Sequence, residues 1–297
     1  MLALVIPYYK YDFFEATLHS LASQTNKQFH VYIGDDASTI PPNDLLLKYQ
    51  GQFSFSYHRF PTNLGGISLV QQWDRCLELV ENETWVQILG DDDTLAPNAV
   101  ASFYEHLEAI EKEKCAVIRF ATQVINENDV PISVIYQHPQ LETAIDFLIR
   151  KFKGGTRSSL SEYIFKKEKV DSIKFKDFPL AWSTDTLAVI EFSESRNIYT
   201  INEVLVFFRR SGKNITSQSD SIEKNTAWFQ FYYYVLSKYG KKYPNFLIDS
   251  LFDKLEKTQF NNKKTPFRWI KLFWLYLTFA KYSRFFSLSS KIKKSIQ

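Results

Sequence analysis

The chain has few cysteines and few glycines, two and nine among 297 residues. Cys76 and Cys115 lie in apolar surroundings and match no metal-binding or redox pattern, so a disulfide framework and a cysteine-based zinc site are excluded. Two buried free thiols in a reducing compartment are the simplest interpretation. Neither G-x-G-x-x-G nor G-x-x-x-x-G-K-[ST] occurs, so dinucleotide-binding and P-loop functions lose their main support.

Long hydrophobic runs are also lacking. No segment reaches the roughly 18 apolar residues that a membrane span needs, and the longest candidate, 269–280, is interrupted by Lys271. Residues 1–7 carry none of the basic residues that begin a signal peptide, and we interpret them as the start of a first strand. We therefore expect a cytoplasmic protein.

Acidic residues are missing from the end of the chain. None follows Glu256, while ten lysines and arginines do; the overall charge of +3 thus leaves −7 for the first 256 residues. The tail, 265–297, places ten aromatic and aliphatic residues within 267–279 alone, among flanking lysines and arginines, a composition typical of segments that lie on an anionic membrane. We expect peripheral binding to the inner face of the plasma membrane; the alternative is a C-terminal helix packed on the main domain. No nucleic-acid recognition fold accompanies the charge, so no nucleic-acid partner is expected.

Apolar residues make up 45% of the chain, enough for a full core. In residues 1–125, strand-like and helical patterns alternate, which predicts an α/β fold with a mostly parallel sheet and helices on both faces. The predicted strands are 2–8, 30–34, 53–60, 84–89 and 115–125, and the predicted helices are 13–23, 67–80 and 98–111. Further on, we predict helices at 141–152 and 183–193, strands at 161–165 and 203–210, and helices from residue 221 onward.

An acidic run, Asp91-Asp92-Asp93, follows the apolar residues 85–89. Three adjacent carboxylates repel one another, and oxygen ligands of this kind suit Mg²⁺ or Mn²⁺, which complete their coordination with substrate phosphates. The alternative is a solvated turn in which Asp93 or Thr94 caps the next helix, ahead of Pro97. The run by itself leaves both interpretations open.

Polar residues follow two other predicted strands. Pro7 and Tyr8 end the first strand, and Asp35 and Asp36 end the second. In open α/β sheets, ligands bind outside the carboxyl ends of the strands. A carboxylate there can accept hydrogen bonds from ribose hydroxyls or from a base.

These segments, taken in order with residues 63–66 (Asn-Leu-Gly-Gly), resemble the family 2 glycosyltransferases of the GT-A fold. The resemblance covers residues 1–125 well and 157–217 more loosely. It implies a catalytic domain over 1–217, with a nucleotide-binding half, 1–125, and an acceptor half, 126–217. Residues 218–297 would form a helical C-terminal region that ends in the basic aromatic tail.

The resemblance also implies roles for single residues. Asp35 would hold the base of the nucleotide, with Asp36 near the nucleoside, and Pro7 and Tyr8 would line the same pocket. A further pair, Asn63 and Gly65, would shape the loop beside the nucleotide, although a plain turn at a helix start explains them equally well.

In the D-x-D motif of this family, the carboxylates hold the ribose and a divalent metal bound to the diphosphate. Asp91 and Asp93 have the required spacing, so we expect Mn²⁺ or Mg²⁺ with Asp93 as the main ligand and Asp91 or Asp92 nearer the ribose. The triple aspartate leaves this register open.

Two downstream segments complete the predicted site. The family places a catalytic base at a helix start, and Asp185 fits that position; the alternative is an early-helix aspartate favoured by the helix dipole. Arg209 and Arg210 begin a basic segment, 209–217, that would close over the diphosphate. A solvated hairpin is the competing explanation for that segment.

The sequence therefore predicts an inverting, metal-dependent glycosyltransferase. It would move a sugar from a nucleotide sugar, UDP-linked by expectation, to a glycan or lipid-linked acceptor hydroxyl in bacterial surface polysaccharide synthesis. Two alternatives remain: a nucleotidyltransferase on a similar sheet, and a non-catalytic protein that binds nucleotide sugars or docks on membranes.

Overall fold

A computed structural model describes residues 1–212, 221–263 and 265–295. The chain forms two compact units. The sheet unit comprises Met1–Asp177 and Thr184–Gln218, and the helical unit comprises Phe178–Ser183 and Ser219–Gln297. Each unit is described by itself below.

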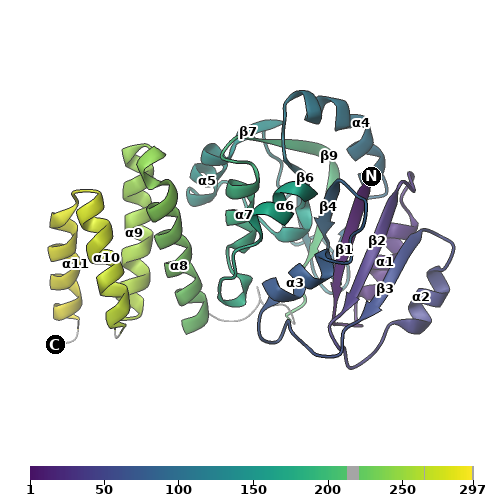
Figure 1. The fold of residues 1–297 in the computed structure, drawn as a ribbon, viewed down its shortest axis with the longest axis horizontal. Helices are drawn as coiled ribbons and strands as arrows, with labels where there is room; N and C mark the ends of the chain where they lie inside the picture. The colour runs from purple at the N-terminus through teal and green to yellow at the C-terminus, as the bar shows by residue number, and fades with distance from the viewer. Residues whose placement is uncertain (213–220, 264, 296–297) are drawn as a thin grey trace. The chain divides into compact units, whose positions relative to one another are not determined.

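Within the described residues, the sheet unit contains one nine-stranded mixed sheet (Figure 1). Its strands are β1 (Leu2–Tyr8), β2 (Phe29–Asp35), β3 (Ser54–Arg59), β4 (Trp85–Ile88), β5 (Thr94–Leu95), β6 (Val117–Ile125), β7 (Leu141–Thr143), β8 (Tyr163–Lys166) and β9 (Asn197–Arg209). The helices of this unit are α1 (Phe14–Ala22), α2 (Asn43–Tyr49), α3 (Leu69–Leu77), α4 (Ala99–Lys112), α5 (Ala144–Phe152), α6 (Lys167–Ile173), α7 (Thr184–Phe192) and the short 3₁₀ helix η1 (Leu160–Glu162).

The strand order is β3-β2-β1-β4-β8-β6-β9-β5, with β7 paired to β9. The first four strands pair in parallel, as do β6 and β9, whereas β8, β5 and β7 pair in antiparallel. Residues 2–6 of β1 are at most 1% exposed. Because successive side chains point to opposite faces of a sheet, both faces must be covered. The predicted α/β class is confirmed.

Some of the predicted element boundaries differ from the structure. The single helix expected at 141–152 was wrong at its start, since Leu141–Thr143 pair with β9 and α5 begins only at Ala144, with Thr143 as its N-cap. The helix-cap interpretation of the acidic run was also wrong. Thr94 lies in β5, and α4 begins at Ala99 after Asn98. Two short helices, α2 and α6, were not predicted.

The helical unit consists of consecutive helices that lie side by side (Figure 1). They are α8 (Ile222–Tyr239), α9 (Asn245–Asn261), α10 (Pro266–Thr278) and α11 (Tyr282–Lys294). The 3₁₀ helix η4 (Gly240–Lys242) lies between α8 and α9, and the short helix η2 (Pro179–Ala181) packs against α8. Buried residues such as Leu251 and Leu272 form its interior. Among the described residues, no helix is both long and apolar enough to span a membrane.

A buried ion pair joins three elements of the sheet unit. Arg119 on β6 is fully buried, and its Nη2 donates to Glu142 Oε2 on β7 at 2.9 Å. Arg150 on α5 also donates to both oxygens of Glu142, at 2.7 and 2.8 Å. Burial acts to raise the pKa of Glu142, but the hydrogen bonds from Arg150 and Arg119 outweigh it and the net shift is downward. Glu142 therefore stays charged and compensates the buried guanidinium.

Replacement of Glu142 should destabilise the sheet unit strongly, because it leaves Arg119 charged and buried without its carboxylate. We expect Glu142→Ala to lower the free energy of unfolding by about 3–5 kcal/mol in chemical denaturation. Glu168→Ala, which removes an exposed carboxylate paired with Lys166, serves as the control and should change stability by less than about 0.5 kcal/mol. Equal effects of the two variants would contradict this account.

Candidate active site

The carboxyl ends of β1, β2 and β4 lie together at one edge of the sheet. β1 pairs in parallel with β2, which sets Tyr8 opposite Asp35, and with β4, which sets Val5 opposite Ile88. The predicted signatures after these three strands are thereby brought to one place. The carboxylates among them, however, differ in their hydrogen-bond partners.

Asp91 organises the loop that follows β1. Its Oδ2 accepts hydrogen bonds from the backbone N–H groups of Tyr9 at 2.8 Å and Lys10 at 2.7 Å. The hydroxyl of Thr17 donates to the backbone carbonyls of Asp91 and Asp93 at 3.1 and 2.9 Å. The acidic run is thus fixed to the end of β1 and to α1.

Asp93 is buried, with 2% of its surface exposed, and both of its carboxylate oxygens are engaged. Oδ1 accepts from the backbone N–H of Arg209 at 2.9 Å, and Oδ2 accepts from the hydroxyl of Ser161. Asp93 therefore joins the acidic run to β9 and to η1.

Asp92 differs from its neighbours. It is half-buried, as Asp91 is, but among the described residues no other residue donates a hydrogen bond to its carboxylate, whereas Asp91 accepts from Tyr9 and Lys10. Burial, followed by the charge of Asp92, raises the pKa of both Asp91 and Asp93 to about 7. Burial also raises the pKa of Asp92. A cation beside Asp92 would relieve this crowding of negative charge.

The donor set fits Mg²⁺ or Mn²⁺ in composition, since it consists of carboxylate oxygens. No group of three or more His, Cys, Asp or Glu side chains forms a metal cage within residues 1–212, 221–263 and 265–295. A metal here would be held by one or two carboxylates and by phosphate oxygens of a substrate, as is common for Mg²⁺.

Asp35 is fully buried at the end of β2, and both oxygens of its carboxylate accept hydrogen bonds from other residues of the chain. Oδ1 accepts from the N–H of Ser38 at 2.7 Å, while Oδ2 accepts from the hydroxyl of Tyr57 at 2.6 Å and from Arg59 at 2.7 Å. Tyr8, also fully buried, donates its hydroxyl to the carbonyl of Ile40. Pro7, the residue before it on β1, lies opposite Gly34 of β2.

Asp36 holds the loop that contains Asn63 and Gly65. Its two oxygens accept from the backbone N–H groups of Leu64 at 2.6 Å and Gly65 at 2.8 Å, and Arg75 also donates to it. A Cβ at position 65 would lie 2.6 Å from Asp36 Oδ2, so glycine is required for this close approach. Asn63 accepts from the N–H of Gly66 and closes the turn.

The two predicted arginines occupy different environments. Arg209 is fully buried, and its guanidinium donates to the carbonyls of Asp92 and Asn126 and to the carboxylate of Asp129. Arg210 is exposed, with its backbone N–H bonded to the carbonyl of Ile125. Residues 213–217 of the predicted closing segment, 209–217, lie outside the described residues.

Asp185 lies at the start of α7 and accepts a hydrogen bond from the hydroxyl of Ser158, which is 3.0 Å from the hydroxyl of Tyr163. Lys151 lies near this carboxylate. Burial lowers the pKa of Lys151, and the charge of Asp185 opposes that shift. The aspartate is thus positioned by a hydroxyl pair and accompanied by a lysine.

One short segment connects the acidic run with Asp185. Ser161 donates to Asp93, and Ser158, three residues earlier, donates to Asp185. Three residues of chain span at most about 11 Å. Arg157, which directly precedes this segment, forms an ion pair with Glu162 at 3.6 Å. Its guanidinium also lies over the ring of Phe208, 4.3 Å from the ring centroid.

Sequence reasoning missed this segment and three arginines, Arg59, Arg75 and Arg157. Isolated serines and arginines outside a motif carry no local signal, because their role depends on which carboxylate the fold places beside them. The site therefore combines predicted carboxylates with positioning residues that only the structure reveals.

The family model described as "Glycosyl transferase family 2" matches residues 3–167, which is more than half of the chain. The chain belongs to this family. No curated protein sequence matches it.

Among solved structures, S. aureus TarS 1–349 in complex with UDP-GlcNAc superposes with a TM-score of 0.66 at 16% identity, covering 88% of this chain and 72% of that one. The Pyrobaculum calidifontis mannosyltransferase PcManGT in complex with GDP-Man and Mn²⁺ gives a TM-score of 0.57 at 11% identity and covers 86% and 68% of the two chains. GalNAc-T7 with UDP, GalNAc and Mn²⁺ gives 0.54 at 12%, with coverage of 87% and 56%. At these identities the likeness establishes the fold, which is that of the GT-A glycosyltransferases.

Proposed function

We propose that this family 2 glycosyltransferase transfers a sugar from a UDP-sugar to an acceptor hydroxyl, with inversion at the anomeric carbon. The observation that carries the proposal is the placement of Asp185 and the acidic run on either side of residues 158–161. One carboxylate is thereby available for proton transfer near a group of carboxylates that could hold the divalent metal of a diphosphate. TarS structures with UDP-GlcNAc and with UDP support the choice of nucleotide by analogy of fold, whereas PcManGT was solved with GDP-Man.

Within this proposal, Asp185 acts as the general base. It accepts the proton of the acceptor hydroxyl while that oxygen bonds to the anomeric carbon and the bond from the sugar to the nucleoside diphosphate breaks. Ser158 donates to one carboxylate oxygen and so orients the other. Attack from the face opposite the leaving group inverts the configuration.

A divalent metal, Mn²⁺ or Mg²⁺, would be held by Asp92, with Asp91 next to it in the chain. When bound, it would supply positive charge to the leaving diphosphate. We favour Asp92 over Asp93, which the sequence had suggested, because both oxygens of Asp93 already accept hydrogen bonds, while no other described residue donates one to the carboxylate of Asp92. Asp93 then acts as a positioning residue.

The nucleoside would lie over the ends of β1 and β2, with Pro7 and Tyr8 beneath it. Both oxygens of Asp35 and of Asp36 already accept hydrogen bonds, among them those from Arg59 and from Gly65, so these residues would shape the pocket through those partners. Exposed Arg210 is available to a phosphate, whereas Arg209 holds the end of β9 in place.

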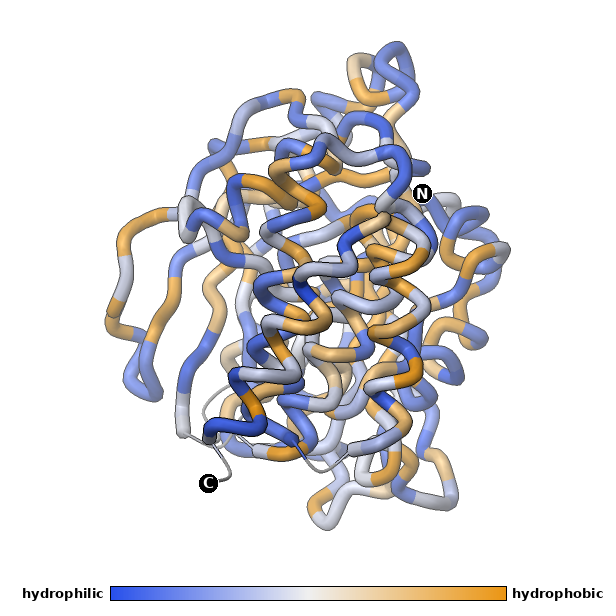
Figure 2. Tube along the Cα trace, turned by 90° about the vertical axis from the view of Figure 1, so that its left-hand side faces the viewer, coloured by the Kyte–Doolittle hydropathy of each residue, from blue (hydrophilic) through white to orange (hydrophobic). Residues whose placement is uncertain are grey.

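The acceptor is proposed to be a glycan, free or lipid-linked, at the inner face of the plasma membrane, as surface polysaccharide synthesis would require. Support comes from α10, where Phe267, Ile270 and Trp274 share one face and are 79%, 56% and 60% exposed. Along the C-terminal helices, hydrophobic and hydrophilic residues alternate (Figure 2). Exposed lysines on α11 would add attraction to anionic lipids.

The role of Asp92 can be tested by calorimetric titration with UDP in the presence of Mn²⁺ and of chelator. We expect metal-dependent binding to weaken at least about tenfold in Asp92→Asn, because a charged ligand is lost. Asp44→Asn, at an exposed carboxylate on α2, is the control and should leave binding unchanged. Metal-independent binding by the native protein would rule out the metal. If Asp92→Asn binds normally while a folded Asp93→Asn does not, the ligand is Asp93.

The role of Asp185 predicts a separation of binding from turnover. Asp185→Asn should lower the rate of sugar transfer about 100-fold or more, because the general base is lost, while UDP binding stays intact. Asp171→Asn, which removes an exposed partner of Lys167, is the matched control. Unchanged turnover in Asp185→Asn would reject this base.

Membrane binding can be measured by sedimentation with phosphatidylglycerol vesicles and with phosphatidylcholine vesicles. The double variant Phe267→Ala and Trp274→Ala should bind phosphatidylglycerol vesicles about tenfold more weakly, because two exposed apolar side chains are removed. Phe246→Ala, a comparably exposed residue on α9, should have no effect. If native protein binds neither kind of vesicle, the membrane proposal fails.

A further inference from the structure

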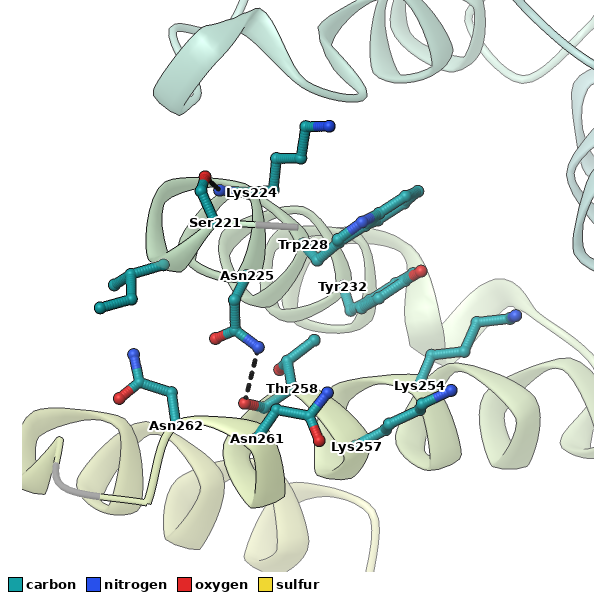
Figure 3. A pocket seen from close by; sticks show the side chains of 11 residues that line it. Ser221, Lys224, Asn225, Trp228, Tyr232, Lys254, Lys257, Thr258, Asn261 and Asn262 are labelled. Carbon is teal, nitrogen blue, oxygen red and sulfur yellow. Dashed lines mark hydrogen bonds between the residues drawn. The ribbon is translucent and has the colours of Figure 1, made fainter. Parts of the chain in front are cut away.

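The helical unit contains a cavity of about 440 Å³ between α8 and α9 (Figure 3). All of its lining residues belong to 221–262 and hence to the helical unit, whereas the carboxylates of the candidate active site belong to the sheet unit. The volume lies within the range of small-ligand sites. The cavity is therefore separate from the nucleotide site in residues and in chemistry.

The wall formed by α8 is aromatic. Trp228 and Tyr232 are one helical turn apart, and their rings stack with centroids 5.3 Å apart and planes at 8°. Tyr232 is 6% exposed and fixes the position of Trp228, which is half-buried. Figure 3 shows both rings extending from α8 side by side. The negative face of an indole ring attracts the weakly positive C–H groups on one face of a sugar ring.

The wall formed by α9 is cationic. Lys254 and Lys257 are three residues apart, which places them on the same side of a helix, and both line the cavity. Figure 3 shows them on the helix that faces the two aromatic rings. No aspartate or glutamate is among the described residues that line the cavity. Lys257, which is exposed, can therefore contact an anionic group in the cavity.

Amide groups lie at the end of α9, where Asn261 and Asn262 line the cavity. A third amide in the lining, that of Asn225, donates to the carbonyl of Thr258 and accepts from Arg268, so it is already used within the chain. An amide offers both a donor and an acceptor, as recognition of a hydroxyl requires.

We propose that this cavity is a second saccharide site, which binds an acidic sugar unit. The sugar ring packs on the aromatic wall formed by Trp228 and Tyr232, its carboxylate or phosphate contacts Lys257, and its hydroxyls bind the amides of Asn261 and Asn262. Stacking alone would suit a nucleobase, and lysines alone would suit free phosphate. The combination with amides in a cavity of this size selects a charged carbohydrate. Binding here does not depend on the transfer reaction.

The test is calorimetric or NMR-detected titration of the full chain with a hyaluronan tetrasaccharide, glucose 6-phosphate, neutral cellotetraose and inorganic phosphate. The first two probes distinguish a carboxylate from a phosphate as the anionic group. At least one should bind about tenfold more tightly than cellotetraose and than inorganic phosphate. Lys257→Ala should weaken that binding about tenfold, because a charged contact is lost. Trp228→Ala should do the same.

Two controls match these changes: Lys291→Ala, at an exposed lysine on α11, and Trp274→Ala, at an exposed tryptophan on α10. Neither should alter saccharide binding, and UDP binding should be unaffected by all four substitutions. Because Lys257 is exposed, its variant keeps the test valid even if Trp228→Ala fails to fold. The proposal is overturned if no saccharide binds, if cellotetraose or phosphate binds equally well, if Lys257→Ala has no effect, or if a single-stranded oligonucleotide binds more tightly than any saccharide.

Discussion

The arrangement of the candidate site depends on one buried carboxylate. Asp93 accepts from the backbone of β9 and from Ser161 of η1, and so joins the end of β4 to two elements that come much later in the chain. A carboxylate with 2% exposure is costly to bury, and these two hydrogen bonds offset that cost. In the part of the chain that the structure describes, no other residue donates a hydrogen bond to the carboxylate of its neighbour Asp92. The segment that carries Ser161 then leads to Ser158 and Asp185.

A second consequence is a division of roles among the aspartates at the sheet edge. Asp36 and Asp91 bind backbone N–H groups of loops, and Asp35 binds Tyr57 and Arg59. These carboxylates fix the loops that would surround a ligand, and they leave few acidic groups for direct contact. Pre-positioned loops of this kind reduce the ordering that binding would otherwise require.

In the helical unit, some of the basic residues that follow Glu256 form ion pairs, and others are exposed on the surface. Lys281 and Arg284 form ion pairs with acidic residues of α9, so part of the excess positive charge is neutralised inside the unit. Lysines of α11 and the aromatic face of α10 remain exposed. Charge composition alone therefore overstates the basic surface, whereas the exposed aromatic residues strengthen the case for an interfacial role.

Much of the fold could be predicted from the sequence. Leu2–Ile6 is a continuous apolar run, and Trp85–Ile88 is apolar except for the buried Gln87, which is the pattern of strands buried on both faces. Short elements escaped prediction. The strand Leu141–Thr143 has no distinctive pattern of its own and exists because β9 offers it hydrogen-bonding partners.

The sequence by itself determined the family, the sheet with its carboxylates at the strand ends, and the helical character of the last 80 or so residues, since these follow from local patterns of apolar and polar residues. Only the tertiary structure decided which carboxylate of the acidic run receives no hydrogen bond from another described residue. Asp91, Asp92 and Asp93 are chemically identical, and they differ only because Tyr9, Arg209 and Ser161 lie beside two of them. The same holds for the cavity between α8 and α9. Its aromatic and basic walls come from separate helices, and their meeting is set by helix packing that no local pattern encodes.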